Sequence, residues 1–449
     1  MIPTFLQRAP IRRLLIVLGI VAVVELITGP PGSNQYPTSG FTGSYAEAAS
    51  FFGLFRTQRW VEFVALALVA WGIVEFWTRF GATIRSRGSV ALAGPRQVSE
   101  KRPVRVGFAL ALLVLGILLP HIVNNAFWQS ALVTYVAIYV LLAIGLNVVV
   151  GFAGLLDLGY VAFYAIGAYT TAWVTGALPT PPPFGHPLDA FWAIPFAVVF
   201  VVIAGVLLGA PTLRLRGDYL AIVTLGFGEI ITIFANNLYG ITGGSTGTKQ
   251  IPHPVFHVGP IKYTWGLAPV PYYYLALGSV VLFLVVFSLL QRSRVGRAWT
   301  AIREDEVAAE SLGINPLKFK VMAFAVGAAS AGFAGVITAS ADNFLFPSSF
   351  TLVFSINILV LVILGGMGSI SGVVVGAIII QVIQAYLNHT PPAGYQQPDL
   401  YIYVGALLIT MMIFRPAGLI PSRQRRREIT LYETSHEGHP DEVLLGDDV

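Results

Sequence analysis

The sequence predicts an all-α polytopic membrane protein with about 10–12 transmembrane helices, some of them short or broken. Hydrophobic residues make up 55% of the 449 residues and charged residues only 11%, whereas soluble domains are roughly 25% charged. Apolar runs of spanning length recur along the chain, and together they exceed what a soluble core could bury. Clusters of lysine and arginine lie between these runs, as expected for loops on the cytoplasmic side.

Residues 1–105 are predicted to form an N-terminal transmembrane hairpin extension with a basic cytoplasmic linker. No clear small-x-small cleavage site follows the first apolar run, 14–28, so an uncleaved span is favoured over a signal peptide. The second run, 60–77, returns through the membrane. The linker, 79–105, is rich in arginine, which places it in the cytoplasm by the positive-inside rule.

Residues 106–421 form the predicted membrane core, and residues 422–449 form a polar cytoplasmic tail. The apolar segments of the core are 106–123, 128–150, 158–175, 190–210, 219–236, 272–290, 321–341, 351–364, 370–387 and 401–414. This arrangement puts every basic cluster on one side of the membrane and both termini in the cytoplasm. Segments 219–236 and 351–364 are short for a hydrocarbon layer of about 30 Å, and they are candidates for half-helices.

The most highly charged stretch inside the core, 291–320, lies between two apolar segments. Residues 293–316 have a helical period that Gly313 and Pro316 end. One face of the predicted helix is apolar and consists of Val295, Trp299, Ile302, Ala309 and Leu312. The opposite face is charged and carries Arg303, Glu304, Asp305 and Glu310. Flanking basic residues place the stretch in the cytoplasm. Such a helix is a docking element for a cytoplasmic partner; the alternative is a helix that lies on lipid headgroups.

Two glycine-rich stretches, 145–169 and 364–377, interrupt the apolar segments. Broken helices form substrate sites in many transporters, because the freed backbone groups line a cavity. Close helix packing is the alternative, and it is favoured for Gly368, Gly372 and Gly376, where a small residue recurs every four positions. For 151–159 both interpretations stay open, because Asp157 lies inside an apolar run.

Polar side chains at membrane depth are a further group of candidates. An ionised carboxylate at mid-bilayer costs at least about 2.5 kcal/mol, so Asp157 and Glu229 are expected to face a cavity, a partner or an interface. A position of Asp157 at the cytoplasmic end of its span is an equal alternative. The residues predicted to line a translocation path are Asp157, Tyr160, Glu229, Asn236, Asn357, Gly365 and Gly366. For the asparagines, hydrogen bonding between helices is the more common role.

The sequence predicts no catalytic residue, no metal site and no cofactor held by this chain. Cysteine is absent, which excludes disulfides, thiol catalysis and cysteine-ligated metals. The segment 243–250, GGSTGTKQ, superficially resembles a phosphate-binding loop, but Lys249 lacks a glycine at the required position before it. Without an ATP site of its own, the chain must use an ion gradient, a partner ATPase, or no energy source.

Motifs in one order along the core resemble a known family. They are GLNVVVGFAGLLDLGYVAFYAIGAY, LRGDYLAIVTLGFGEI, GRAWTAIREDEVAAESLGIN, ILGGMGSISGVVVGA and RPAGLIP. With them, residues 106–421 resemble the LivM-type permease of bacterial branched-chain amino-acid ABC importers. The hairpin before residue 105 resembles the extension found on this subunit and not on its LivH-type sister. One departure from the general coupling motif of such permeases is Val307, which separates Glu306 from Ala308 and Ala309.

The resemblance implies a permease subunit in the bacterial inner membrane that imports branched-chain or other hydrophobic amino acids by alternating access. The implied partners are a LivH-type permease, two cytoplasmic ATPases that hold ATP and Mg, and a periplasmic substrate-binding protein.

The same resemblance makes residues 293–316 a coupling helix whose apolar side seats in a groove of an ATPase. The residues assigned to coupling are Trp299, Ile302, Arg303, Glu304, Asp305, Glu306, Ala308, Ala309 and Gly313. Two alternative functions stay open. One is a urea or short-chain amide permease of the same superfamily, and the other is a gradient-driven carrier that acts alone.

Overall fold

The computed structural model describes residues 102–123, 125–212, 218–258 and 261–389, together with 404–405, 408–409, 411 and 418–420. The predicted N-terminal spans, nearly all of the basic linker, most of 401–414 and the tail lie outside the described residues. The chain divides into two units, 1–114 and 115–449, and every element after α3 lies in the second.

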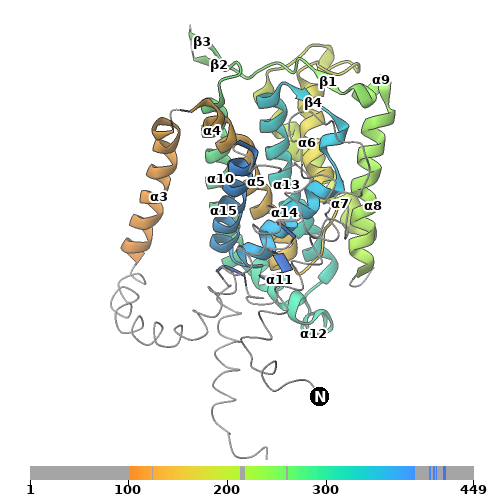
Figure 1. Ribbon diagram of the computed structural model, residues 1–449. Coiled ribbons are helices and arrows are strands. Elements are labelled where there is room, and N and C mark those ends of the chain that lie inside the picture. The colour runs from red at the N-terminus through yellow and green to blue at the C-terminus, as the bar shows by residue number, and fades with distance from the viewer. Residues whose placement is uncertain are drawn as a thin grey trace, which may run out of the picture. The chain divides into compact units, whose positions relative to one another are not determined.

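Helices dominate the described residues, which confirms the predicted all-α polytopic membrane class (Figure 1). They are α3 (Arg102–Ile122), α4 (Ala126–Ala131), α5 (Ile138–Leu146), α6 (Tyr160–Val174), α7 (Ala193–Thr212), α8 (Asp218–Asn237), α9 (Tyr239–Thr242), α10 (Pro269–Arg292), α11 (Arg294–Glu304), α12 (Glu306–Ser311), α13 (Pro316–Asp342), α14 (Leu352–Gly365) and α15 (Ile370–His389). Within the described residues, 7 helical segments are long and apolar enough to cross a membrane.

The predicted span 128–150 is one continuous helical run, Ala126–Phe152, of 27 residues. Two π-helical turns, Leu132–Ala137 and Asn147–Phe152, flank α5 within this run. Such turns are rare and occur often at functional sites. The run stops at the first glycine-rich stretch, where Gly154 has a φ of 71°, a conformation that glycine adopts without steric cost.

Both segments predicted as candidate half-helices reach spanning length in the structure. α8 has 20 residues and is long enough to span. α14 alone has 14 residues, about 21 Å, and it reaches spanning length together with the turn before it, as the 19-residue segment Pro347–Gly365. Its last carbonyls, at Leu364 and Gly365, accept hydrogen bonds from the N–H groups of Leu419 and Ile420 at 2.9 and 3.2 Å. The GLIP motif near the end of the core therefore closes the end of α14.

α13 lies at the centre of the second unit and packs mainly against α6, α7 and α5 (Figure 1). Small residues allow the close approach that is typical of helix packing in lipid. A Cβ atom on Gly167 would come within 2.7 Å of the Gly332 Cα, and one on Gly327 would come within 2.6 Å of the Val149 side chain. The core is therefore built from contacts between glycine-bearing helix faces.

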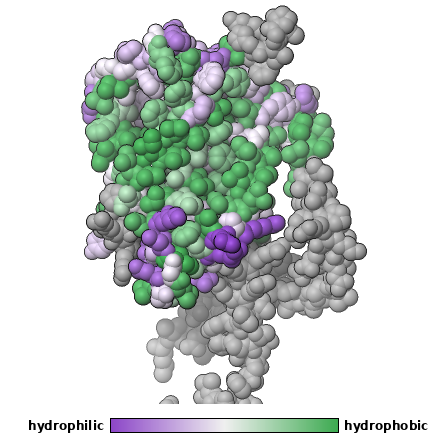
Figure 2. Space-filling model, turned by 180° about the vertical axis from the view of Figure 1, so that it is seen from behind, coloured by the Kyte–Doolittle hydropathy of each residue, from purple (hydrophilic) through white to green (hydrophobic). Residues whose placement is uncertain are grey.

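The surface of the helices is apolar in the middle and polar at both ends, as Figure 2 shows for one face. Short antiparallel strands gather at one end, where β1 (Thr248–Lys249) pairs with β4 (Phe344–Leu345), and β2 (Val255–Val258) pairs with β3 (Ile261–Thr264). α11 and α12 lie at the opposite end (Figure 1). The charged stretch and the long connector before α10 therefore occupy opposite ends of the helices.

Candidate functional site

The charged stretch folds into two short helices, where the sequence predicted one. Ser293 Oγ accepts a hydrogen bond from the N–H group of Val295 at 3.1 Å and so caps α11. Asp305 then breaks the helix, with φ −152° and ψ 112°. Its Oδ1 accepts from the N–H groups of Val307 at 2.9 Å and Ala308 at 3.0 Å, so it starts α12. Asp305 is thus a capping residue, a role that its place on the charged face did not indicate.

The end of α12 is the glycine stop that the sequence predicted. Gly313 has a φ of 83°, and its N–H group donates to the Glu310 carbonyl at 2.9 Å. The N–H group of Ile314 donates to the Ala309 carbonyl at 3.1 Å, which completes a Schellman turn. Asn315 then caps α13, accepting from the N–H group of Lys318 at 3.1 Å. Residues 293–315, which hold α11 and α12, form the α11–α12 hairpin. Hydrogen-bonded caps at the ends of both helices give this hairpin a fixed shape.

The apolar side of the hairpin packs on the chain's own helices. Trp299 is 1% exposed and donates from Nε1 to the Phe319 carbonyl at 2.7 Å, while Ile302 and Ala309 are also buried. Leu312 points away and is 80% exposed. Trp299, Ile302 and Ala309 are therefore covered by the chain itself. This does not fit the expectation that they seat in a groove of an ATPase together with Leu312. The apolar surface left for a partner consists of Leu312 and Val307, which is also exposed.

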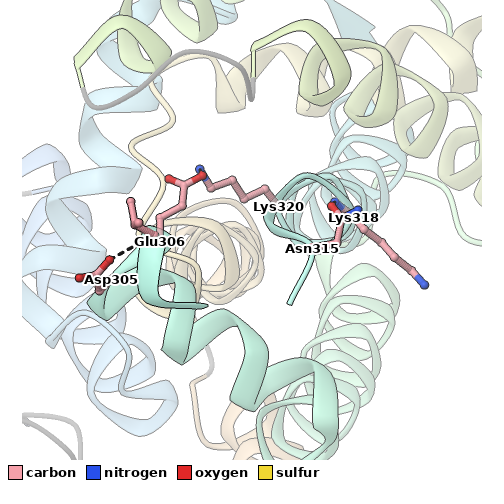
Figure 3. A network of polar contacts seen from close by, with 6 residues as sticks. Asp305, Glu306, Asn315, Lys318 and Lys320 are labelled. Carbon is pink, nitrogen blue, oxygen red and sulfur yellow. Dashed lines mark hydrogen bonds and ion pairs between the residues drawn. The ribbon is translucent and has the colours of Figure 1, made fainter. Parts of the chain in front are cut away.

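An ion pair between a buried lysine and a half-buried glutamate ties α12 to the start of α13. Lys320 Nζ lies 2.6 Å from Glu306 Oε1, and the Lys320 side chain is 6% exposed (Figure 3). Because a charge out of water needs a partner, this pair holds the hairpin against the helix that runs through the centre of the core. Glu306 therefore has a partner within the chain, whereas Glu304 and Glu310 are exposed.

Arg303 connects the hairpin to the first glycine break. Its Nη1 donates a hydrogen bond to the Gly151 carbonyl oxygen. Beside it, Asn147 Oδ1 accepts from the Gly368 N–H group at 2.9 Å, which joins the first glycine stretch to the second. A Cβ atom on Gly368 would lie 3.1 Å from Arg303 Nη1. Arg303 thus reaches the contact between the first glycine-rich stretch and the second.

Asp157 lies in the connection between the Ala126–Phe152 run and α6, and it is fully buried. Its Oδ1 accepts from the Gly159 N–H group at 2.9 Å, and Oδ2 has no partner among the described residues. Burial raises the pKa of this carboxyl to about 7, and the Gly159 hydrogen bond opposes that rise. The neighbouring Leu158 N–H group donates to Thr224 Oγ1 at 3.1 Å, so the segment is fixed to α8.

The other predicted path residues have local partners or lie apart on the helices. Tyr160 donates to the Gly327 carbonyl at 2.9 Å, between α6 and α13. Asn357 Oδ1 accepts from Gln384 Nε2 at 3.3 Å, between α14 and α15. Glu229 and Asn236 are half-buried on α8. Among the described residues, no hydrogen bond joins two of the predicted path residues.

The glycines of the second stretch pack closely against one another, which agrees with the interpretation that they serve helix packing. Gly376 lies so close to Gly365 that a Cβ atom would come within 2.6 Å of the Gly365 Cα, and Gly372 also packs against Gly365. Gly366, with a φ of 113°, forms the turn after α14. Gly365 therefore lies in the close contact between α14 and α15, and Gly366 lies in the turn that connects them.

A cavity of about 180 Å³ lies at the end of the helices opposite the hairpin. Its lining includes Thr338 and Asp342 from α13, and Tyr139 from α5. No motif in the sequence indicates these residues. Asp342 falls one position beyond the predicted span 321–341.

A match to a known protein family identifies the class of protein to which this chain belongs. The family model for the branched-chain amino acid transport system permease component matches residues 129–414, which include both glycine breaks and the hairpin. The chain belongs to this family. The resemblance found from the sequence motifs is thereby confirmed.

Individual members of the family agree with this assignment. The chain is 42% identical over 332 residues to the high-affinity branched-chain amino acid transport system permease protein LivM of Escherichia coli K12, covering 70% of this chain and 74% of the relative. It is 41% identical to LivM of Salmonella typhimurium over the same shares of both chains. The LivH permease protein of Escherichia coli K12 is 26% identical over 298 residues, 64% of this chain and 92% of the relative. No solved structure matches the chain.

Proposed function

We propose that this chain is the permease subunit of an ATP-driven importer of branched-chain and other hydrophobic amino acids, placed in the bacterial inner membrane. Its partners are a LivH-type sister permease, two cytoplasmic ATPases and a periplasmic substrate-binding protein. Support comes from membership of the family and from the names of the LivM and LivH relatives. ATP and Mg are held by the ATPases, and this chain performs no catalysis.

The observation that carries the coupling mechanism is the hydrogen bond from Arg303 to the Gly151 carbonyl. The α11–α12 hairpin offers exposed Val307 and Leu312 to an ATPase, together with the exposed carboxylates of Glu304 and Glu310. Its buried side is fixed to α13 by Trp299. A displacement of the hairpin when the ATPases close is therefore transmitted through Arg303 to the glycine break.

The orientation of the subunit in the membrane follows from the placement of the hairpin in the cytoplasm. Arg292, Arg294, Arg297 and Lys318 gather at this end of the helices, and basic residues favour the cytoplasmic side. The end with the β strands then faces outward, toward the binding protein. Transport proceeds by alternating access, in which the helices open first at the strand end and then at the hairpin end.

The deciding experiment reconstitutes the full importer in liposomes with the binding protein and measures uptake of radiolabelled leucine. We expect uptake that requires ATP inside the vesicles and all partner subunits. Uptake by this chain alone without ATP would establish a gradient-driven carrier instead. Identification of the ligand that co-purifies with the binding protein separates an amino-acid importer from a urea or amide importer.

A further inference from the structure

The cavity at the strand end has a composition that suits a particular class of ligand. Its volume of about 180 Å³ exceeds by more than tenfold the roughly 10–15 Å³ that one water needs. It is smaller than the roughly 300–1,000 Å³ of drug-sized ligand sites. The cavity therefore has room for a small metabolite.

One wall of the cavity is aromatic. Tyr164 and Phe354 stack with centroids 5.2 Å apart and an interplanar angle of 5°. Phe350 meets Tyr164 edge-on at 5.4 Å, and Tyr139 lies 5.2 Å from Phe354. Aromatic surfaces bind apolar groups, and their faces attract ammonium groups. This wall suits both an aliphatic side chain and an alkylammonium group.

The lining also carries polar groups, which lie close to Tyr164 of the aromatic wall. Asp342, the last residue of α13, is the one charged residue among the described residues that line the cavity, and no cation there pairs with it. Thr338, one turn earlier on α13, has a buried hydroxyl that lies beside the Tyr164 hydroxyl and interacts with it. A carboxylate without a paired cation beside the Thr338 and Tyr164 hydroxyls is suited to bind a ligand with several N–H donors.

The backbone around the cavity is irregular, which is a separate observation. Tyr135 and Thr134 reach the lining from the π-helical turn Leu132–Ala137, and such turns occur often at functional sites. The outer edge is formed by Phe344 and Ser349, both exposed, so the cavity opens toward the strand end. Phe344 belongs to β4, which pairs with β1 from the long connector before α10.

We propose that this cavity is a binding site for the apolar α-amino acid on its way through the subunit, with the ammonium group on Asp342 and Thr338, the aliphatic side chain on the aromatic wall, and the carboxylate at the exposed edge beside Ser349, where water solvates it. This proposal rests on the proposed function, because it takes the transported molecule to be an amino acid that enters from the strand end. It assigns substrate contact to residues outside both glycine stretches.

The test compares variants of the full importer in liposomes, with leucine uptake measured over a range of concentrations. Loss of a charge-assisted hydrogen bond predicts that Asp342→Asn lowers uptake at low substrate concentration by about tenfold. Thr338→Val, which keeps the side-chain shape, is expected to lower it several-fold. The matched control is Ser348→Ala, an exposed residue of the 3₁₀ turn Pro347–Ser349 that does not line the cavity and is expected to transport normally.

A second measurement does not depend on how the variants fold. A leucine analogue with a diazirine in its side chain is crosslinked to the wild-type importer and the labelled peptides are identified. We expect labels on Phe350, Phe354 or Tyr139. Excess leucine should displace the label, whereas 4-methylpentanoate, which lacks the ammonium group, should not.

The outcomes separate this inference from the proposed function. ATP-dependent leucine uptake by the wild type, with unchanged uptake in both cavity variants or with labels confined to other helices, would overturn the inference alone. Loss of ATP-dependent uptake in the wild type would overturn the proposed function. If Asp342→Asn does not reach the membrane, Thr338→Val and the crosslinked peptides decide the question.

Discussion

Arg303 of α11 donates a hydrogen bond to the carbonyl oxygen of Gly151, 152 positions earlier in the chain. The donor belongs to the charged hairpin, and the acceptor belongs to the π-helical turn that ends the Ala126–Phe152 run. Gly368 of the second glycine stretch lies beside both. This contact joins the exposed hairpin with the interior of the helices.

Replacement of Arg303 by alanine is expected to uncouple the importer. The change removes the charged donor to the Gly151 carbonyl and with it the contact between the hairpin and the glycine break. We expect leucine uptake to fall about tenfold or more while the ATPases remain bound. Uptake and ATP hydrolysis are measured together in reconstituted vesicles. Arg297→Ala removes an exposed arginine of the same helix and serves as the control; equal uptake by the two variants would contradict the coupling role.

Leu312→Glu is expected to weaken binding of the ATPase subunits without disturbing the fold. Leu312 is 80% exposed on the hairpin, so a charge there meets no part of the chain's own core. Co-purification of the ATPases with the permease is the measurement. Leu267→Glu makes the same change at a residue that is 72% exposed just before α10, at the strand end. ATPase recovery that is unchanged for Leu312→Glu, or reduced equally for both, would show that the hairpin is not the docking surface.

Gly151→Ala is expected to lower both Tm and uptake. A Cβ atom there would overlap the Asn147 side chain and the Gly368 backbone, and overpacking of this kind costs about 1–3 kcal/mol. Thermal unfolding in detergent measures the loss. Gly278→Ala on α10 is the matched control, because a Cβ atom at Gly278 meets nothing within 4 Å. An unchanged Tm for Gly151→Ala would mean that the contact between the two glycine stretches can relax.

The buried carboxyl of Asp157 is expected to make the free energy of unfolding depend on pH. Burial raises its pKa from 3.8 to about 7, so the folded protein binds more protons than the unfolded chain between these values. The free energy of unfolding contributed by this group is therefore highest below pH 3.8, falls as pH rises toward 7, and is level above it. Comparison of Tm against pH for the wild type and Asp157→Asn measures the contribution. Two parallel curves between pH 4 and 7 would contradict it.

Much of the fold could be predicted from local sequence. The apolar segments 190–210 and 272–290 coincide closely with α7 and α10, because hydropathy over a run of residues reports directly on burial in lipid. The stop at Gly313 was also local, since only the glycine's own backbone and its near neighbours form that turn. The motifs between residues 145 and 421 were sufficient to indicate the family.

The direction of individual side chains on the hairpin depended on tertiary structure. Trp299 and Leu312 share an apolar helical pattern, yet Trp299 packs on α13 and Leu312 is exposed, because Asp305 breaks the helix between them. Asp342 similarly joins Thr338 and the aromatic wall only when α13, α5, α6 and α14 meet. Local composition was enough to identify the segments that are long and apolar enough to cross a membrane, because hydropathy belongs to each segment alone. Tertiary structure decided which side chains share a site, because contacts between residues far apart in sequence form only when the helices pack.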